Sequence, residues 1–193
     1  GGGASRAQLA RGATLSLLSI GLALVLGPLL TAVFAPAEAS KAAKLLFTAF
    51  VTASVAEETA RWIALLLLSR AMVTKDPREF LCGAVAVGLG FGVLEKVRYL
   101  HNAQNALALG ALRGVLTAPG HLAYALVSAA GLWSWRHARG SFLDALIALG
   151  LAVLLHGFYD AAVMSWEVQT GASDAAPLSG LAFWSLFAAV AVS

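Results

Sequence analysis

Long apolar segments, each about the length of a membrane-spanning helix, restrict what this chain can fold into. About 20 consecutive apolar residues cross the hydrocarbon core of a bilayer as a helix, and by that measure the sequence predicts about six spanning segments. These segments are 14–34, 42–69, 80–100, 111–135, 142–166 and 178–192. A bilayer core contains no water to pair with free backbone groups, so only helices and closed barrels span it. We therefore expect an all-α fold, a polytopic transmembrane helical bundle.

The connections between the apolar segments are short and rich in proline, glycine and charged residues, as in "APAEASK" and "WRHARGS". None of them is long enough for a soluble domain. The 193 residues are 60% apolar and 12% charged, against about half and about a quarter in soluble domains. We therefore expect 1–193 to form a single integral membrane domain. Residues 1–13 would be a short polar leader whose first five residues could be an artificial extension.

The charge pattern predicts how the chain is oriented in the membrane and which partners it binds, and the cysteine content limits its disulfides and metal sites. The membrane side that would hold the N-terminus carries slightly more Lys and Arg in its short connections, which predicts a cytoplasmic N-terminus. The net charge of +3 comes without a basic block or an aromatic platform, so we expect the lipid bilayer as a partner and no nucleic acid. The single cysteine, Cys82, excludes an internal disulfide and a metal site built from cysteines. The oligomeric state is left open.

Ionisable residues lie deep within four of the predicted segments. A charged side chain at the centre of a bilayer costs about 2.5 to 3.5 kcal/mol even on insertion scales, so such residues indicate a functional site. At about 1.5 Å of helix rise per residue, the glutamates and histidines among them lie roughly 18 to 23 Å from one membrane face and can meet in one layer. The ionisable residues are Glu57, Glu58, Arg61, Glu95, His121, His156 and Asp160.

The spacing of these residues within each segment suggests chemistry. The motif "HGFYD" places His156 and Asp160 four residues apart on one helix face, where they can bind one metal ion or pair by a hydrogen bond. The motif "EETAR" places Arg61 within one helical turn of Glu57 and Glu58, close enough to neutralise one of two crowded carboxylates. The other carboxylate is then suited to act as a general base.

Other interpretations of the same residues remain open. They could form a structural ion network in a non-catalytic scaffold, where the polar groups only help the helices to assemble. They could also be the proton or cation relay of a transporter or channel, which would give ion-coupled flux. Taken alone, His121 could be a satisfied core histidine, and Glu95 could mark a helix end where it pairs with Lys96 and Arg98.

Four motifs follow one another on successive predicted segments: "EETAR" (57–61), "FGVLE" (91–95), "HLAYA" (121–125) and "HGFYD" (156–160). In this order they resemble the motifs of PrsW-type intramembrane proteases, which are relatives of the CAAX prenyl protease and bacteriocin-processing superfamily. The resemblance covers about 54–163 and implies a four-helix catalytic core there. It implies an enzyme of a bacterial cell membrane that hydrolyses peptide bonds of a membrane-anchored protein, such as an anti-sigma factor.

The resemblance also implies a role for each matching residue. Glu57 would be the general base that activates water, with Glu58 beside it and Arg61 holding the pair. The remaining residues of the motifs would orient water, stabilise an oxyanion or bind a metal ion. They are Glu95, His121, His156 and Asp160.

The cofactor is left open between two mechanisms. Two histidines with Glu95 or Asp160 would suit Zn²⁺, which binds nitrogen and carboxylate oxygen and keeps a position for water. In a metal-free mechanism His121 or His156 would instead polarise the carbonyl oxygen of the substrate. In the CAAX relatives, histidine and often asparagine stand where this sequence has Glu95 and Asp160, so the resemblance does not decide between the two.

Overall fold

A computed structural model of the chain describes residues 2–72, 76–102 and 106–170, and every regular element in these ranges is a helix. The all-α prediction is therefore confirmed for the described residues. The predicted segment 178–192 lies outside them. The elements are α1 (Gly2–Phe34), α2 (Lys41–Phe47), the π-helix η1 (Thr48–Val55), α3 (Ala56–Arg70), α4 (Pro77–Asn102), α5 (Ala106–His137) and α6 (Phe142–Thr170).

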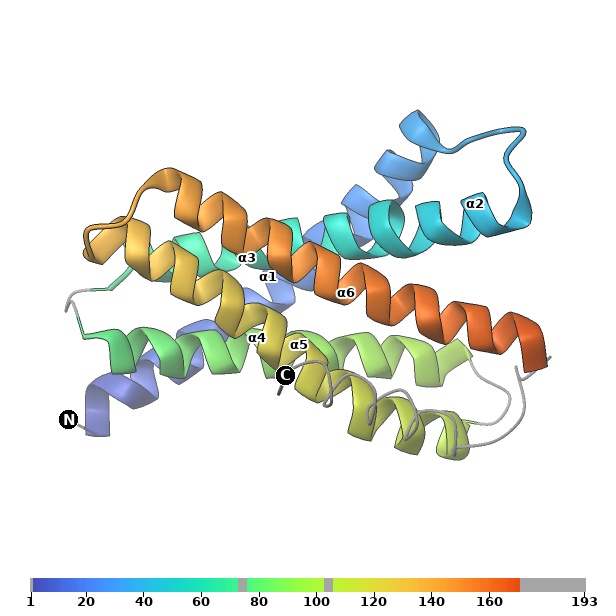
Figure 1. Cartoon of the computed structure of the whole chain (residues 1–193). Coiled ribbons are helices and arrows are strands. Elements are labelled where there is room, and N and C mark those ends of the chain that lie inside the picture. The colour runs from blue at the N-terminus through green and yellow to red at the C-terminus, as the bar shows by residue number, and fades with distance from the viewer. Residues whose placement is uncertain (1, 73–75, 103–105, 171–193) are drawn as a thin grey trace, which may run out of the picture.

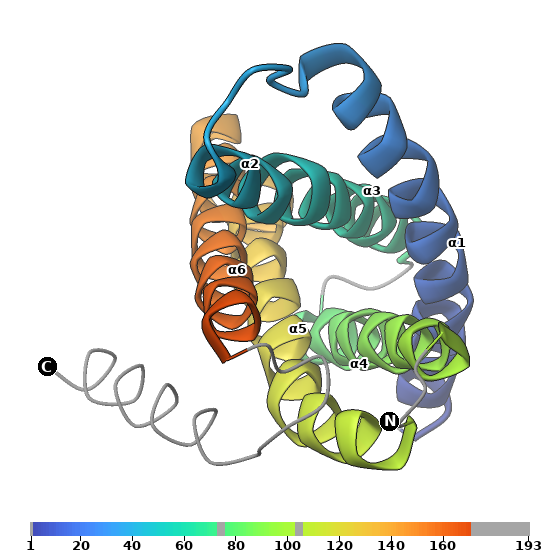
Figure 2. The ribbon, with the colours of Figure 1, turned by 90° about the vertical axis from the view of Figure 1, so that its right-hand side faces the viewer.

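The helices form a ring in which each packs against its neighbours. Helix α1 packs against α3 and α4, α5 lies between α4 and α6, and α6 runs along η1, as Figure 2 shows. Helix α3 also contacts α4, α5 and α6. The side chains of α3 that face the other helices therefore meet side chains from α4, α5 and α6 within one bundle.

Within the described residues, three helices are long and apolar enough to cross a membrane: Arg6–Phe34, Pro77–Val97 and Phe142–Ser165. They correspond to three of the predicted segments. The predicted segments 42–69 and 111–135 are helical but do not belong to this group. The first of them is divided among α2, η1 and α3, which form one continuous helical path in Figure 1. The count of six spans thus stays a prediction.

Helix α1 shows how the sequence separates a lipid side from a packing side. Large apolar residues cover its exposed side, including Leu17, Leu18, Leu24, Val25, Leu29 and Val33. The buried positions recur every three or four residues and carry small or polar side chains. They are Gln8, Gly12, Ser16, Ser19, Ala23 and Gly27. Small residues let two helix backbones approach closely, which is how helices pack when lipid is as apolar as leucine.

Glycines occupy the tight contacts between neighbouring helices. A methyl group at Gly88 of α4 would lie 2.8 Å from Cβ of Ala125 and 3.0 Å from the carbonyl oxygen of His121, both on α5. A methyl group at Gly131 of α5 would likewise meet backbone atoms of α6. These close contacts fix how far α4 and α6 stand from α5, and His121 lies in the first of them.

The π-helical segment leads directly into the two glutamates of α3. Such wide turns are rare and frequently occur at functional sites. Ser54, at the end of η1, is buried and donates a hydrogen bond to the carbonyl oxygen of Val153 on α6, at 2.5 Å. This bond fixes the position of the first turn of α3 relative to α6, so Glu57 and Glu58 face the middle of that helix.

We predict that Gly88→Ala lowers the free energy of unfolding by about 1 to 3 kcal/mol, because the added methyl group overpacks the contact between α4 and α5. The measurement is thermal unfolding of the purified protein in detergent. The matched control is Gly150→Ala on α6, where an added methyl group meets nothing within 4 Å. This control should keep or slightly raise the stability, since alanine favours helix by up to about 1 kcal/mol. Equal melting temperatures for both variants would contradict the prediction.

Candidate active site

The bundle contains a buried ion pair between Glu58 and Arg61, one helical turn apart on α3. Arg61 Nη1 lies 2.5 Å from Glu58 Oε1, and both side chains are 0% exposed. The guanidinium also stacks over the ring of Phe91 on α4, with its carbon 4.3 Å from the ring centroid. The sequence predicted the pairing of Arg61 with a neighbouring carboxylate, and Glu58 is the closer partner.

His156 on α6 is oriented by the same carboxylate. Its Nδ1 lies 2.7 Å from Glu58 Oε1, and because a carboxylate only accepts, Nδ1 carries the hydrogen and donates it. This bond fixes the orientation of the ring and leaves Nε2 as the atom that can accept a proton or bind a metal. A carboxylate behind a histidine is the usual partner of a metal-binding imidazole.

His121 on α5 is held from both sides. Its Nδ1 lies 2.9 Å from Arg61 Nη2, and because arginine only donates, Nδ1 accepts this bond. Its Nε2 then carries the hydrogen and donates it to Glu95 Oε2 on α4, at 2.6 Å. Both imidazoles therefore face α3 with Nδ1, while Nε2 points to other groups.

The remaining two carboxylates lie around Nε2 of His156. Asp160 Oδ2 is 3.4 Å from this atom, and Glu57 Oε2 is 3.8 Å from it. Glu57 Oε2 also lies 4.0 Å from Arg61 Nη2. The side chains of Glu57 and Asp160 are 14% and 19% exposed, more than those of the other groups in the cluster.

All the residues that the sequence singled out thus converge, as their shared depth predicted. They come from α3, α4, α5 and α6, and each lies within 4.0 Å of another member. We call this set the polar cluster. It consists of Glu57, Glu58, Arg61, Glu95, His121, His156 and Asp160.

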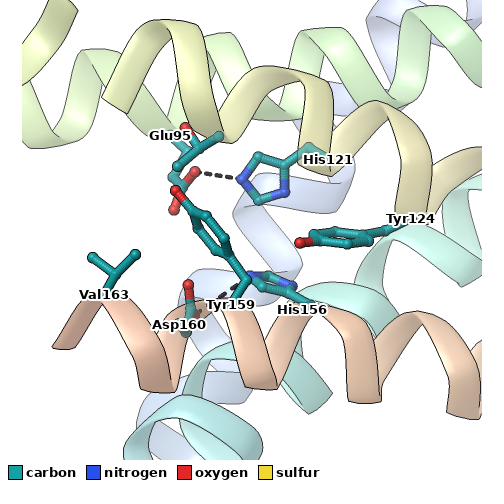
Figure 3. A pocket seen from close by; sticks show the side chains of 8 residues that line it. Glu95, His121, Tyr124, His156, Tyr159, Asp160 and Val163 are labelled. Atoms are coloured by element: carbon teal, nitrogen blue, oxygen red, sulfur yellow. Dashed lines mark hydrogen bonds and ion pairs between the residues drawn. The ribbon is translucent and has the colours of Figure 1, made fainter. Parts of the chain in front are cut away.

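A cavity of about 30 Å³ opens beside the polar cluster, which is room for at least one water molecule. Figure 3 shows the histidines and the carboxylates of α4 and α6 around it. The lining residues are Glu95, Thr117, His121, Tyr124, His156, Tyr159, Asp160 and Val163.

Two tyrosines at this cavity were not predicted. Tyr124 and Tyr159 each stand three residues after one of the histidines, in "HLAYA" and "HGFYD". Residues three apart share a helix face, so the signal was present in the motifs already quoted. It was overlooked because tyrosine is common at membrane interfaces without chemical function.

The donor atoms of the polar cluster fit a metal ion. One ligand atom from each of Glu57, His121 and His156 can be chosen so that all lie within 4.8 Å of one another. Two imidazoles and a carboxylate are a frequent zinc ligand set. Glu57 Oε2 is buried and has no hydrogen-bond partner among the described residues, so a cation would satisfy it. The predicted carboxylate ligands Glu95 and Asp160 are not in this group, and each contacts one imidazole instead.

The chain matches a protein-family model described as PrsW family intramembrane metalloprotease, over residues 5–192. A search of curated proteins and a search of solved structures gave no match.

We predict that Arg61→Met destabilises the protein by about 3 to 5 kcal/mol, because it leaves the charge of Glu58 buried without its main partner. The double variant Glu58→Gln with Arg61→Met should be more stable than Arg61→Met alone, since no uncompensated charge remains. The measurement is the melting temperature in detergent, with the exposed Glu38→Gln as control. A double variant less stable than the single one would show that the pair is not coupled in this way.

Proposed function

Since the chain belongs to the PrsW family of intramembrane metalloproteases, it is an intramembrane peptidase, and we propose that the polar cluster is its active site. The observation that carries this proposal is the convergence of ionisable side chains from four helices beside a cavity of water size, which the members from α4, α5 and α6 line. Buried ionisable groups in a membrane protein are costly and are kept where they bind or react.

We assign Glu57 the role of general base. It is the carboxylate of α3 that the ion pair leaves uncommitted, because Glu58 is the group that pairs closely with Arg61 and His156. Its Oε2 is free of hydrogen bonds among the described residues and lies 3.8 Å from Nε2 of His156. Glu57 can therefore take a proton from a water molecule beside the imidazole and return it to the departing amine.

Glu58 and Arg61 act as positioning residues. Glu58 fixes the tautomer and the direction of the His156 ring, and Arg61 does the same for His121. Neither needs to touch the substrate. Their contribution is to hold two imidazoles at a constant distance from Glu57, and such preorganisation is what accelerates a reaction in a buried site.

We further propose that His121 and His156 hold a zinc ion together with acidic groups of the polar cluster. Both histidines turn Nε2 towards the carboxylates of α4 and α6, Glu95 and Asp160, which line the cavity with them. Nitrogen and carboxylate donors suit zinc. When bound, such an ion supplies Lewis-acid polarisation of the scissile carbonyl and of water. A carboxylate as near as Glu57 could compete as a ligand, and the experiment below separates the two roles.

The finer organisation of the enzyme is also proposed. We infer six membrane spans in a single domain over 1–193, a cytoplasmic N-terminus and a bacterial membrane, with the catalytic core in 54–163. The apolar lengths and the excess of positive charge on one side support this arrangement. The substrate would be a membrane-anchored protein, and an anti-sigma factor is one candidate, by analogy with the family.

We predict that Glu57→Gln retains about one zinc per chain but loses cleavage by a factor of about 100 or more, because the ligands stay and the base is gone. His156→Ala should lose both the bound zinc and the cleavage activity. The measurements are elemental analysis after dialysis against trace zinc, and mass spectrometry of new N-termini when the purified enzyme is mixed with solubilised membrane proteins. Glu38→Gln is the control, as an exposed glutamate far from the cluster in sequence.

The outcomes separate the roles. Loss of zinc in Glu57→Gln would make Glu57 a ligand rather than the base. Full zinc content in His156→Ala would remove this histidine from the ligand set. Cleavage by Glu57→Gln at the rate of the unmodified enzyme would contradict the proposed active site as a whole.

A further inference from the structure

Tyr124 presents a hydroxyl group to the cavity between the two histidines. It lies on α5, one turn after His121, and lines the cavity while its side chain is otherwise buried. In Figure 3 its hydroxyl end points into the space between the rings of His121 and His156, towards Tyr159. This hydroxyl therefore lies where the polar cluster surrounds the space for a water-sized group.

The ring of Tyr124 is held rigidly. It stacks on His156 with the ring centroids 5.0 Å apart and the planes 15° apart, and it meets the edge of His121 at 6.2 Å and 87°. On its own helix Gly120 leaves the room that the hydroxyl needs, since a methyl group at Gly120 would lie 3.2 Å from Tyr124 Oη. A donor fixed in this manner needs no reorganisation when it is used.

The hydroxyl of Tyr124 faces the cavity, where a ligand or a water molecule can supply the hydrogen-bond partner that a buried phenol normally finds. Most donors of the polar cluster are already engaged, and Arg61 Nε, which has no partner among the described residues, does not line the cavity. Arg61 donates to Glu58 and His121, and His121 donates to Glu95. In Figure 3 the hydroxyl end of Tyr159 lies towards Glu95. Tyr124 is thus a donor that faces the cavity and is available to a ligand that enters it.

On the basis of the proposed function, we propose that Tyr124 is a catalytic residue that donates a hydrogen bond to the oxyanion formed during peptide hydrolysis. The oxygen of water bonds to the carbonyl carbon while Glu57 takes the proton, and the carbonyl oxygen becomes the oxyanion that accepts from Tyr124. The carbon–nitrogen bond then breaks, and the amine receives the proton from Glu57. Tyr124 keeps its own proton throughout.

A fixed donor aimed at a developing oxyanion acts mainly on the transition state. Removing one such donor from an enzyme lowers kcat by about 10²- to 10³-fold where the donor is a principal one. Binding of the substrate in its ground state changes little, so KM should be nearly constant. This pattern differs from that of a residue that only packs, because loss of packing changes stability and metal content as well.

The test is Tyr124→Phe, which removes the hydroxyl and keeps the ring on His156. The substrate is a synthetic peptide carrying the site whose cleavage depends on Glu57 in the experiment on membrane proteins above. We expect kcat to fall about 10- to 100-fold, with KM, melting temperature and zinc content nearly unchanged. A phosphinate analogue of the peptide, which imitates the tetrahedral oxyanion, should bind more weakly by the same factor as the loss in kcat/KM.

The matched control is Ser128→Ala. Ser128 lies on α5 one turn beyond Tyr124, is buried, has a hydroxyl without a partner and does not line the cavity. It should keep kcat and the affinity for the phosphinate. Tyr124→Phe with unchanged kcat, or with lower kcat and unchanged phosphinate affinity, would overturn the role of Tyr124 alone. The absence of any cleavage site that depends on Glu57 would overturn the proposed function and this inference with it.

Discussion

The buried ion pair between Glu58 and Arg61 is the interaction on which the rest of the site depends. Removing two charges from water costs several kcal/mol for each ion, which only close mutual contact and further hydrogen bonds can offset. Both partners have such bonds, because Glu58 accepts one from His156 and Arg61 donates one to His121. The pair therefore ties α3 to α5 and α6. The need to compensate its own charges is also what aligns the two imidazoles, so stability and preorganisation have one physical origin.

Much of this could be predicted from the sequence, because it follows from helix geometry. The spacing within "EETAR" predicts contact of Arg61 with its neighbours, and the common depth of the glutamates and histidines predicts their convergence. What could not be predicted is which atom meets which. Asp160 is the i+4 neighbour of His156, yet Glu58 of another helix contacts Nδ1 of this histidine. The packing of α6 along η1 decides which carboxylate faces which edge of the ring. Spacing along one helix carries no information about such contacts between helices.

The same reasoning explains why Tyr124 escaped notice. In the sequence it is an ordinary aromatic residue of an apolar helix, and its importance arises from the stacking on His156, which belongs to another helix.

The two ring nitrogen atoms of His121 and of His156 contact different groups. On each histidine Nδ1 contacts a residue of α3. For His121 the contact with Arg61 places the proton on Nε2, so a metal ion could bind through that atom only if the ring proton moved to Nδ1 and the contact between Nδ1 and Arg61 rearranged. Arg61 thereby influences loading of the site as well as its shape.

The two-sided character of α1 has a consequence for biogenesis. This helix leaves the ribosome before α3 and α4, and it enters the bilayer before these helices, which cover its polar side, have been made. Ser16 meets Gly90 of α4, and Gly27 meets Thr52 of η1. Neither contact can form until α4 and η1 have been synthesised. During that interval Gln8, Ser16 and Ser19 face lipid or the insertion machinery with no more than bonds inside their own helix. Synthesis of α4 would therefore be the moment at which α1 changes from an independently inserted segment to a member of the bundle.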